Sequence, residues 1–457
     1  MTWPGIFLGR LGAWTAVGLR SSLLRSSAGI GGLTSVELVL GLLTAILLAR
    51  DLGAEGFGTY SLALAAVILA GLPVEFGLPT LVTREIAYDS AGQESGVAKG
   101  VVIFAATVIV FTSAVIVTVL LVFGDTLAAG LDRSVRPILP IAVLLIPVSA
   151  LCNMLGGALV GMQRVVIGNM PQKLVRPGIF ALALGAASVL DPGWLTPTRA
   201  MVLQLIAATV ALMFAGFCFV RHFADLLRRH DAQISWRTWT ASMFRLGLSN
   251  SLRLGQGQIL LLVTGALSSV ENAGLFRIAQ RGAGLVGLGA MILVISSAPR
   301  VAKLDAEGQH ARLQRLLTQI ARGGAVVALA GLVCYVFSAH WLLATFFGAE
   351  FGAAWSALLI LTVAETLRVA FGAGGMLMNM LRHEGVTALG NSISFVIATS
   401  IAAALIPVYG VDGAAWGMFF GILARVLFLR HEARRRLRLD PAAFGRPVRF
   451  GSTKEEP

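Results

Sequence analysis

The sequence predicts an all-α polytopic membrane protein, with about twelve transmembrane helices in two pseudo-symmetric six-helix lobes around a central cavity. Three observations predict this fold. The 457 residues are 56% hydrophobic and only 13% charged, and mean hydropathy is +0.82, whereas about 25% of residues are charged in soluble domains. The apolar residues form twelve stretches of roughly the 20 residues that a helix needs to cross a bilayer. One segment of the chain also recurs farther on.

The twelve apolar stretches are separated by charged residues or Gly/Pro clusters. Residues 1–28 precede them and carry three Arg residues among Leu and Trp, which predicts an amphipathic segment at the cytoplasmic surface. Pro73, Gly77 and Pro79 predict a kink near the end of the second span. We expect spans near residues 29–49, 57–83, 97–122, 136–160, 171–190, 199–220, 246–268, 273–299, 320–340, 354–380, 386–408 and 411–429.

An internal repeat divides these spans into two sets of six. Residues 30–93 recur 216 positions later, so that Gly58-Thr59-Tyr60 returns as Gly274-Leu275-Phe276. Because six spans per copy leave both copies in the same orientation, the repeat is parallel, with its axis along the membrane normal. The expected units are an N-lobe at 29–222, a cytoplasmic linker at 223–244, a C-lobe at 245–430 and a basic cytoplasmic tail at 431–457.

The net charge of +13 reflects membrane topology. Most of the 36 Lys and Arg residues fall on the side of the spans that carries both termini. Cytoplasmic segments of membrane proteins have this excess, so both termini are expected in the cytoplasm. The basic clusters are not interleaved with aromatic residues, so no nucleic-acid partner is expected. Membrane lipids are the expected contacts of these clusters.

Signatures of catalysis, metal binding or cofactor binding are lacking. The run from Gly282 to Gly287 matches the dinucleotide pattern, but it lies in an apolar helix and follows no strand, so close helix packing explains it better, as it does for Gly157 and Gly161 or Gly417 and Gly421. The His and Cys residues are scattered without ligand spacing. We therefore expect no enzyme, no metal and no cofactor.

Charged residues at membrane depth are the candidate functional residues, because each costs about 2.5–3.5 kcal/mol to insert. Glu37 lies mid-span, and the repeat maps it onto Arg253. This opposite-charge pair could bridge the lobes in one state and separate in the other. Asn250 and Gln256 add hydrogen-bonding groups around Arg253, which is the first candidate for binding substrate.

Arg277 and Arg281 lie four residues apart and so share one helix face. Their equivalents in the first copy, Ser61 and Ala65, are neutral. The two Arg residues could form a cationic wall that holds a phosphate, since Arg binds oxygen pairs and stays protonated. For Arg277, pairing with Glu271 near the headgroups is the alternative.

Four further charged residues have open interpretations. Glu365 and Arg368 lie three residues apart, so a structural ion pair and a substrate contact are both compatible with their spacing. Arg84 and Arg300 are equivalent under the repeat and end their spans at the cytoplasmic face. They are expected either to anchor helix ends or to act as gates.

The run from Leu47 to Ser61, Phe76-Gly77-Leu78-Pro79 and Val82-Thr83-Arg84-Glu85 resemble the first spans of bacterial polysaccharide transporters. These belong to the multidrug/oligosaccharidyl-lipid/polysaccharide exporter (MOP) superfamily. The resemblance covers residues 29–430 and implies a flippase fold of twelve helices with a central cationic cavity. It also implies a bacterial cytoplasmic membrane, an isoprenoid-linked glycan as substrate, and glycan polymerase or assembly partners.

The expected function is thus translocation of lipid-linked oligosaccharides from the inner to the outer leaflet by alternating access. A multidrug exporter of the same superfamily, coupled to protons or sodium through Glu37 or Glu75, is one alternative. A membrane-integral glycan polymerase or ligase is another, although the short outer loops leave little room for a catalytic site.

Overall fold

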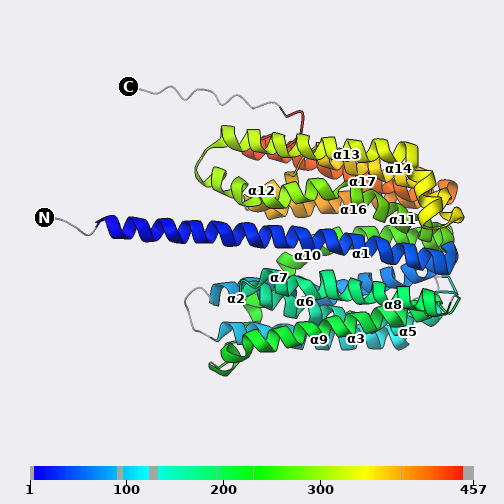
Figure 1. The fold of residues 1–457 in the computed structure, drawn as a ribbon, viewed down its shortest axis with the longest axis horizontal. Coiled ribbons are helices and arrows are strands. Elements are labelled where there is room, and N and C mark those ends of the chain that lie inside the picture. Colours follow the sequence, from blue (N-terminus) through cyan, green and yellow to red (C-terminus); the bar gives the residue numbers. More distant parts are fainter. Residues whose placement is uncertain are drawn as a thin grey trace.

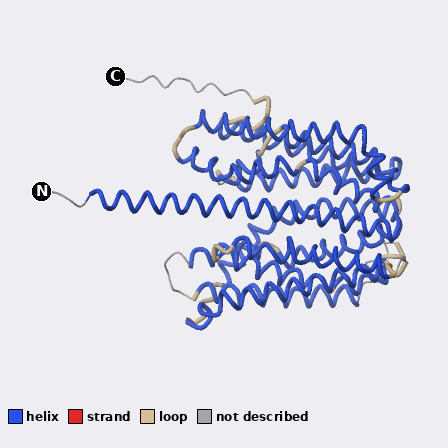
Figure 2. Tube along the Cα trace, in the orientation of Figure 1, coloured by secondary structure: helices blue, strands red, loops and turns tan. Residues whose placement is uncertain are grey.

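A computed structural model describes residues 5–89, 96–122, 132–191, 193–229, 231–381 and 383–445, with the backbone alone for 5–28, for 30 and for part of 224–306. Within these ranges the chain is helical and contains no strand (Figure 2). The helices run side by side along one direction, and the chain turns at the two ends of the bundle (Figure 1). One end carries both termini and is called the termini end here.

Two groups of helices form the two predicted lobes (Figure 1). The N-lobe contains α1 (Gly5–Glu75), α2 (Leu78–Asp89), α3 (Val97–Val122), η2 (Arg136–Ile138), α5 (Leu139–Val143), α6 (Leu145–Gly161), α7 (Val165–Met170), η3 (Pro171–Val175), α8 (Arg176–Leu190) and α9 (Pro197–Arg229). The C-lobe contains α10 (Trp236–Leu267), α11 (Val270–Val286), α12 (Leu288–Ala306), α13 (His310–Phe346), η4 (Ala349–Ala354), α14 (Trp355–Ala370), α15 (Gly374–Met380), α16 (Glu384–Tyr409), α17 (Val411–Glu432) and η5 (Ala433–Leu437).

The helices make the predicted number of passes. Nine stretches of the described residues are long and apolar enough to span a membrane. The first of them, Gly31–Asp89, contains two passes because α1 bends back at Gly53. Helix α10 and the pair α11–α12 supply two more passes, which gives twelve (Figure 1). Helix α3 begins and ends where the sequence predicted the third span.

The first expected span, 29–49, and most of the second, 57–83, lie in α1, which turns back at a single residue. Gly53 has φ of 67°, in the left-handed region that favours glycine. The backbone N–H of Ala54, freed by this turn, donates to Glu350 Oε1 of the C-lobe at 2.9 Å. The equivalent of Gly53 in the repeat is Ser269, which caps α11 from within its own lobe by accepting from Asn272 N at 3.1 Å.

The two lobes touch through a reciprocal contact at the Gly53 end. Gly58 lies so close to the Val270 carbonyl that a Cβ atom would overlap it, and a Cβ on Gly274 would meet the Ala54 carbonyl oxygen at 2.6 Å. The 216-residue repeat relates Ala54 to Val270 and Gly58 to Gly274. Each lobe therefore presents the same glycine and the same carbonyl to the other, as a two-fold interface requires.

Arg50 and Glu350 hold the lobes together beside this contact. Arg50 donates to Phe346 O at 2.9 Å and to Thr345 O at 2.6 Å, the last carbonyls of α13, where a cation is favoured by unsatisfied acceptors and by the helix dipole. Glu350 caps the second arm of α1 in return. We call the pair Arg50 and Glu350, with the backbone groups that they bind, the lobe clasp.

Small residues let helices pack closely within each lobe, as the sequence predicted. A Cβ on Gly157 or Gly161 of α6 would lie 2.7–2.8 Å from carbonyl oxygens of α2, and one on Gly417 or Gly421 of α17 would lie 2.7 Å from carbonyl oxygens of α16. The predicted kink is present as a break between α1 and α2, where Gly77 has φ of 74°. Met243 of α10 packs its carbonyl against this glycine.

Two segments that were expected to lie outside the lobes, the linker and the tail, contain more regular or packed structure than predicted. Helices α9 and α10 extend into the expected linker at 223–244 and leave residues 230–235 between them. Of the expected tail at 431–457, the part up to residue 445 packs on the C-lobe. Asp440, which is 2% exposed, accepts from Arg430 at 2.8 Å, and its backbone N–H and carbonyl both bond to Gln314.

Replacing Glu350 with Ala should loosen the lobe clasp, because the Ala54 N–H loses its acceptor. Loss of a helix cap costs about 1 kcal/mol, or roughly a fivefold shift in an equilibrium. Spin labels at the exposed positions Val189 and Tyr409, in a Cys334→Ser background, would report lobe separation by pulsed electron double resonance. Glu350→Ala should raise the population with a long distance. Glu55→Ala removes an exposed carboxylate at the same end and should not; equal effects would contradict the clasp.

Candidate functional site

Three Arg residues of the C-lobe lie at one depth in the bundle. Arg253 is 14 residues from Leu267, Arg368 is 13 from Trp355, and Arg425 is 14 from Val411, each counted from the helix end near Gly53. At 1.5 Å per residue these offsets correspond to about 20 Å. The three residues therefore lie at a similar depth in the bundle, and Arg425 is close enough to Arg253 and Arg368 to feel their charge.

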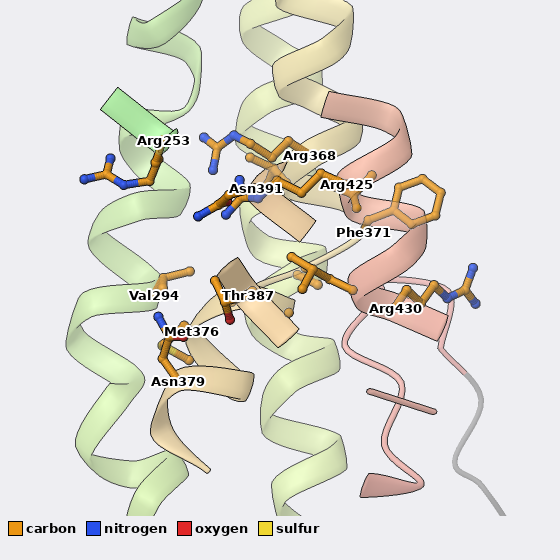
Figure 3. Close-up of a pocket in the computed structure, with 18 of the residues that line it drawn as sticks. Arg253, Val294, Arg368, Phe371, Met376, Asn379, Thr387, Asn391, Arg425 and Arg430 are labelled. Atoms are coloured by element: carbon orange, nitrogen blue, oxygen red, sulfur yellow. The ribbon is translucent and has the colours of Figure 1, made fainter. Parts of the chain in front are cut away.

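These residues line a cavity of about 810 Å³, which we call the C-lobe cavity. Figure 3 shows Arg368, Arg425 and Asn391 close together, with Thr387, Met376 and Asn379 nearer the termini end. Arg430 also lines the cavity, but it points away from the other labelled side chains. The cavity is walled by residues of α10, α12, α13, α14, α15, α16 and α17.

The cations of the cavity differ in how they are neutralised. Arg368 pairs with Glu365 at 2.6 Å, and Arg430 pairs with Asp440 at 2.8 Å. The Nε atom of Arg425 is buried and finds no hydrogen-bond partner among the described residues, and the same holds for the Oγ1 atom of Thr387. Buried polar atoms in folded proteins nearly always have a partner, so both atoms mark places where a ligand or water could bind.

Gln256 closes the cavity on the side towards Gly53. Its Oε1 accepts from Ser394 Oγ at 3.1 Å, and its Nε2 would lie 3.2 Å from a Cβ on Gly421. Each of these residues lies one turn beyond a cavity residue: Gln256 beyond Arg253, Ser394 beyond Asn391 and Gly421 beyond Arg425. The structure thus places Gln256 in a roof of packed helices. The side chain of Asn250 is outside the described residues.

A second group of cations lies where the lobes face each other. Arg281 of α11 donates to the Gly41 carbonyl of α1 across the interface, and Arg277 donates to Gln258 at 3.5 Å. Arg176 of α8 donates to Ser149 at 3.2 Å and to Gln172 at 3.3 Å. We call Arg176, Arg277 and Arg281 the central cluster.

Tyr60 joins the members of the central cluster. It is 3% exposed, stacks on Phe180 with ring centroids 6.3 Å apart and lies near enough to all three guanidinium groups to feel their charge. Within the described part of the chain, no carboxylate lies within salt-bridge distance of any of the three. Glu75 is near Arg176 but accepts its hydrogen bond from Asn153 at 2.8 Å.

The remaining predicted residues make contacts within one lobe. Glu37 accepts from Lys173 Nζ at 2.8 Å, and Lys173 also donates to Thr34 at 3.0 Å. In this structure the hypothesised partner of Arg253 is therefore neutralised inside the N-lobe. Arg84 pairs with its neighbour Glu85 at 2.7 Å. Arg300 is exposed on α12 near the termini end.

Comparison with known proteins identifies the family. A model of the family described as polysaccharide biosynthesis protein matches residues 23–302, more than half of the chain. The chain belongs to the polysaccharide biosynthesis protein family. It is similar to Stage V sporulation protein B of Bacillus subtilis (strain 168), with 23% identity over 219 residues, or 47% of this chain. Those residues span 41% of that protein's length.

Solved structures share the fold of this family member. A multidrug resistance MATE family transporter of the MOP superfamily in an inward-facing conformation gives a TM-score of 0.74 at 15% identity, over 88% of this chain and 94% of that one. A MOP superfamily transporter from Pyrococcus furiosus, described by a binding pocket of reverse polarity, gives 0.64 at 16% identity, over 91% and 95%. The predicted two-lobe fold is thus confirmed, and the family match confirms the resemblance to polysaccharide biosynthesis proteins.

Sequence reasoning missed three cations of this family member. Arg425, Arg176 and Lys173 are not among the predicted site residues, although each lies inside an apolar span. The signal was present, since Arg425 interrupts the run from Phe419 to Leu429. Among the residues with described placement, no group of three or more His, Cys, Asp or Glu could hold a metal ion.

Gly421→Ala should disrupt the roof of the C-lobe cavity. Its Cβ would lie 2.6 Å from Ala398 Cβ and 2.7 Å from the Ser394 carbonyl oxygen, so α17 must move away from α16. Overpacking of this kind costs about 1–3 kcal/mol, which should appear as a lower denaturant midpoint in detergent unfolding. Gly284→Ala is the matched change, because no atom lies within 4 Å of its Cβ. If both variants unfold alike, the roof is placed wrongly.

Proposed function

We propose that the chain is a flippase that moves lipid-linked oligosaccharide or polysaccharide repeat units from the inner to the outer leaflet of a bacterial cytoplasmic membrane. One observation carries the proposal. Arg277 and Arg281, joined by Arg176 around Tyr60, lie between the lobes, and among the described residues none of the three has a carboxylate partner. Family membership supplies the link to polysaccharide biosynthesis.

The central cluster suits the phosphate groups of such a substrate. Cations inside a membrane protein are costly unless they are paired, and uncompensated ones mark substrate pathways. Arg guanidinium groups remain protonated and bind phosphate oxygens in pairs. In this proposal the three groups replace the hydration of the carrier phosphate while the isoprenoid chain stays in the lipid. Cationic drugs would be repelled at this place.

The way the lobes meet supports transport by alternating access. The reciprocal contact of Gly58 and Gly274 and the lobe clasp join the lobes at the Gly53 end. Rocking of two repeats about a shared axis is the usual motion of transporters built from duplicated bundles. With both termini in the cytoplasm, the clasped end is the outer one, and the phosphate enters between the lobes from the inner leaflet.

A cation-coupled multidrug exporter is the second candidate. The similarity to multidrug resistance transporters favours it, as does Glu75, a half-buried carboxylate that bonds to the neutral Asn153. Glu37, the other carboxylate proposed for coupling, already pairs with Lys173. Drug resistance conferred by the wild type and lost in Glu75→Gln would favour the exporter.

Arg281→Gln should abolish translocation, because the phosphate loses one of its three cations. In a strain that lacks the gene, the variant should leave lipid-linked glycans on the inner leaflet and lower their outer-leaflet amount at least tenfold, measured by leaflet-resolved analysis after complementation. Arg237→Gln, at an exposed position of α10, should complement fully. The proposal fails if deletion of the gene does not change the leaflet distribution, or if a folded, membrane-inserted Arg281→Gln protein complements as well as the wild type.

A further inference from the structure

The C-lobe cavity has the features of a second binding site. It shares no lining residue with the central cluster, and the roof formed by Gln256, Ser394 and Gly421 closes it towards the Gly53 end. Its volume of about 810 Å³ lies within the range of pockets that enclose small-molecule ligands. A cavity of this size inside one lobe is not required for holding the two lobes together.

The charges that line the cavity indicate what it binds. Four guanidinium groups line it, from Arg253, Arg368, Arg425 and Arg430. Arg368 pairs with Glu365 and Arg430 pairs with Asp440, whereas within the described residues no carboxylate lies within salt-bridge distance of Arg425. An acidic group of a ligand can therefore pair with Arg425, and one carboxylate is enough for one guanidinium group.

The unpartnered atoms show where such a ligand would bind. Within the described part of the chain, Arg425 Nε is a buried donor without an acceptor, and Thr387 Oγ1 is a buried hydroxyl without a partner. Asn391 follows Thr387 by one turn on the face of α16 that lines the cavity. It lies beside Arg425 (Figure 3). A ligand that places a carboxylate at Arg425 and hydroxyl groups towards Thr387 and Asn379 would be a sugar acid.

We propose that the C-lobe cavity binds a carboxylate-bearing sugar of the translocated glycan, apart from the carrier phosphate at the central cluster. The role of this sugar in transport rests on the proposed function; its binding does not. The cavity then selects acidic glycans over neutral ones. A neutral sugar would cover Arg425 without pairing it, and a site with an unpaired buried polar group rejects such ligands strongly.

Binding to the purified full-length protein in nanodiscs tests the site. The probes are glucuronosyl-xylobiose, which has one carboxylate, the neutral xylotriose, and farnesyl pyrophosphate for the central cluster. The acidic trisaccharide should bind at least tenfold more tightly than xylotriose by calorimetric titration. Arg425→Gln should remove this preference and leave farnesyl pyrophosphate binding unchanged. Arg281→Gln should do the reverse, and Arg237→Gln should change neither.

Thr387→Val is a second variant that tests the site if Arg425→Gln does not fold. It keeps the side-chain shape and should weaken the acidic trisaccharide about threefold or more. Equal binding of the two trisaccharides, or loss of acidic binding in Arg281→Gln but not in Arg425→Gln, overturns the inference. If the acidic trisaccharide binds as expected but the wild type moves no lipid-linked glycan, the binding site is supported and the proposed function alone fails.

Discussion

The reciprocal contact between Gly58 and Val270 and between Gly274 and Ala54 is the constraint on which the arrangement of the lobes depends. It brings two backbones so close that only glycine fits, and it does so twice, related by the internal repeat. It places the pseudo-two-fold axis at the start of α11 and of the second arm of α1. The helices that begin there, and the residues Tyr60, Arg277 and Arg281 on them, are thereby brought towards the axis, where the two lobes face each other.

Within this symmetric frame the two copies differ in charge. In the N-lobe, Glu37 and Lys173 neutralise each other at 2.8 Å. The offset of 216 residues maps Glu37 onto Arg253. A weaker echo relates Gly161-Met162-Gln163-Arg164 to Asn379-Met380-Leu381-Arg382 with an offset of 218, and this offset maps Lys173 onto Asn391. The ion pair of one lobe thus corresponds to a cation and an amide in the other, and both of these line the C-lobe cavity. Duplication supplied the scaffold, and divergence at equivalent positions supplied the excess positive charge.

The sequence predicted the fold well because hydropathy and the repeat determine it. The bounds of α3 were predicted to the residue, since a long apolar run has only one way to cross a bilayer. The sequence predicted a turn between the first two spans, but not that the single residue Gly53 makes it. The backbone N–H that this turn exposes is capped by Glu350, about 300 positions away, and local sequence patterns do not encode such a contact. The site was predicted less well. Arg425 was overlooked, and the partners of Glu37 and Arg430 depend on tertiary contacts that periodicity does not encode.

The two groups of cations differ in how lobe motion affects them. The central cluster draws Arg176 from the N-lobe and Arg277 and Arg281 from the C-lobe, and Arg281 bonds to a carbonyl of the opposite lobe. Rocking of the lobes must therefore change its geometry. Arg253, Arg368 and Arg425 all belong to the C-lobe, so the cavity moves as a unit with that lobe. Under the proposed function, the phosphate contacts would weaken as the lobes separate, while a sugar bound in the cavity would move together with the C-lobe. Release would then begin at the phosphate.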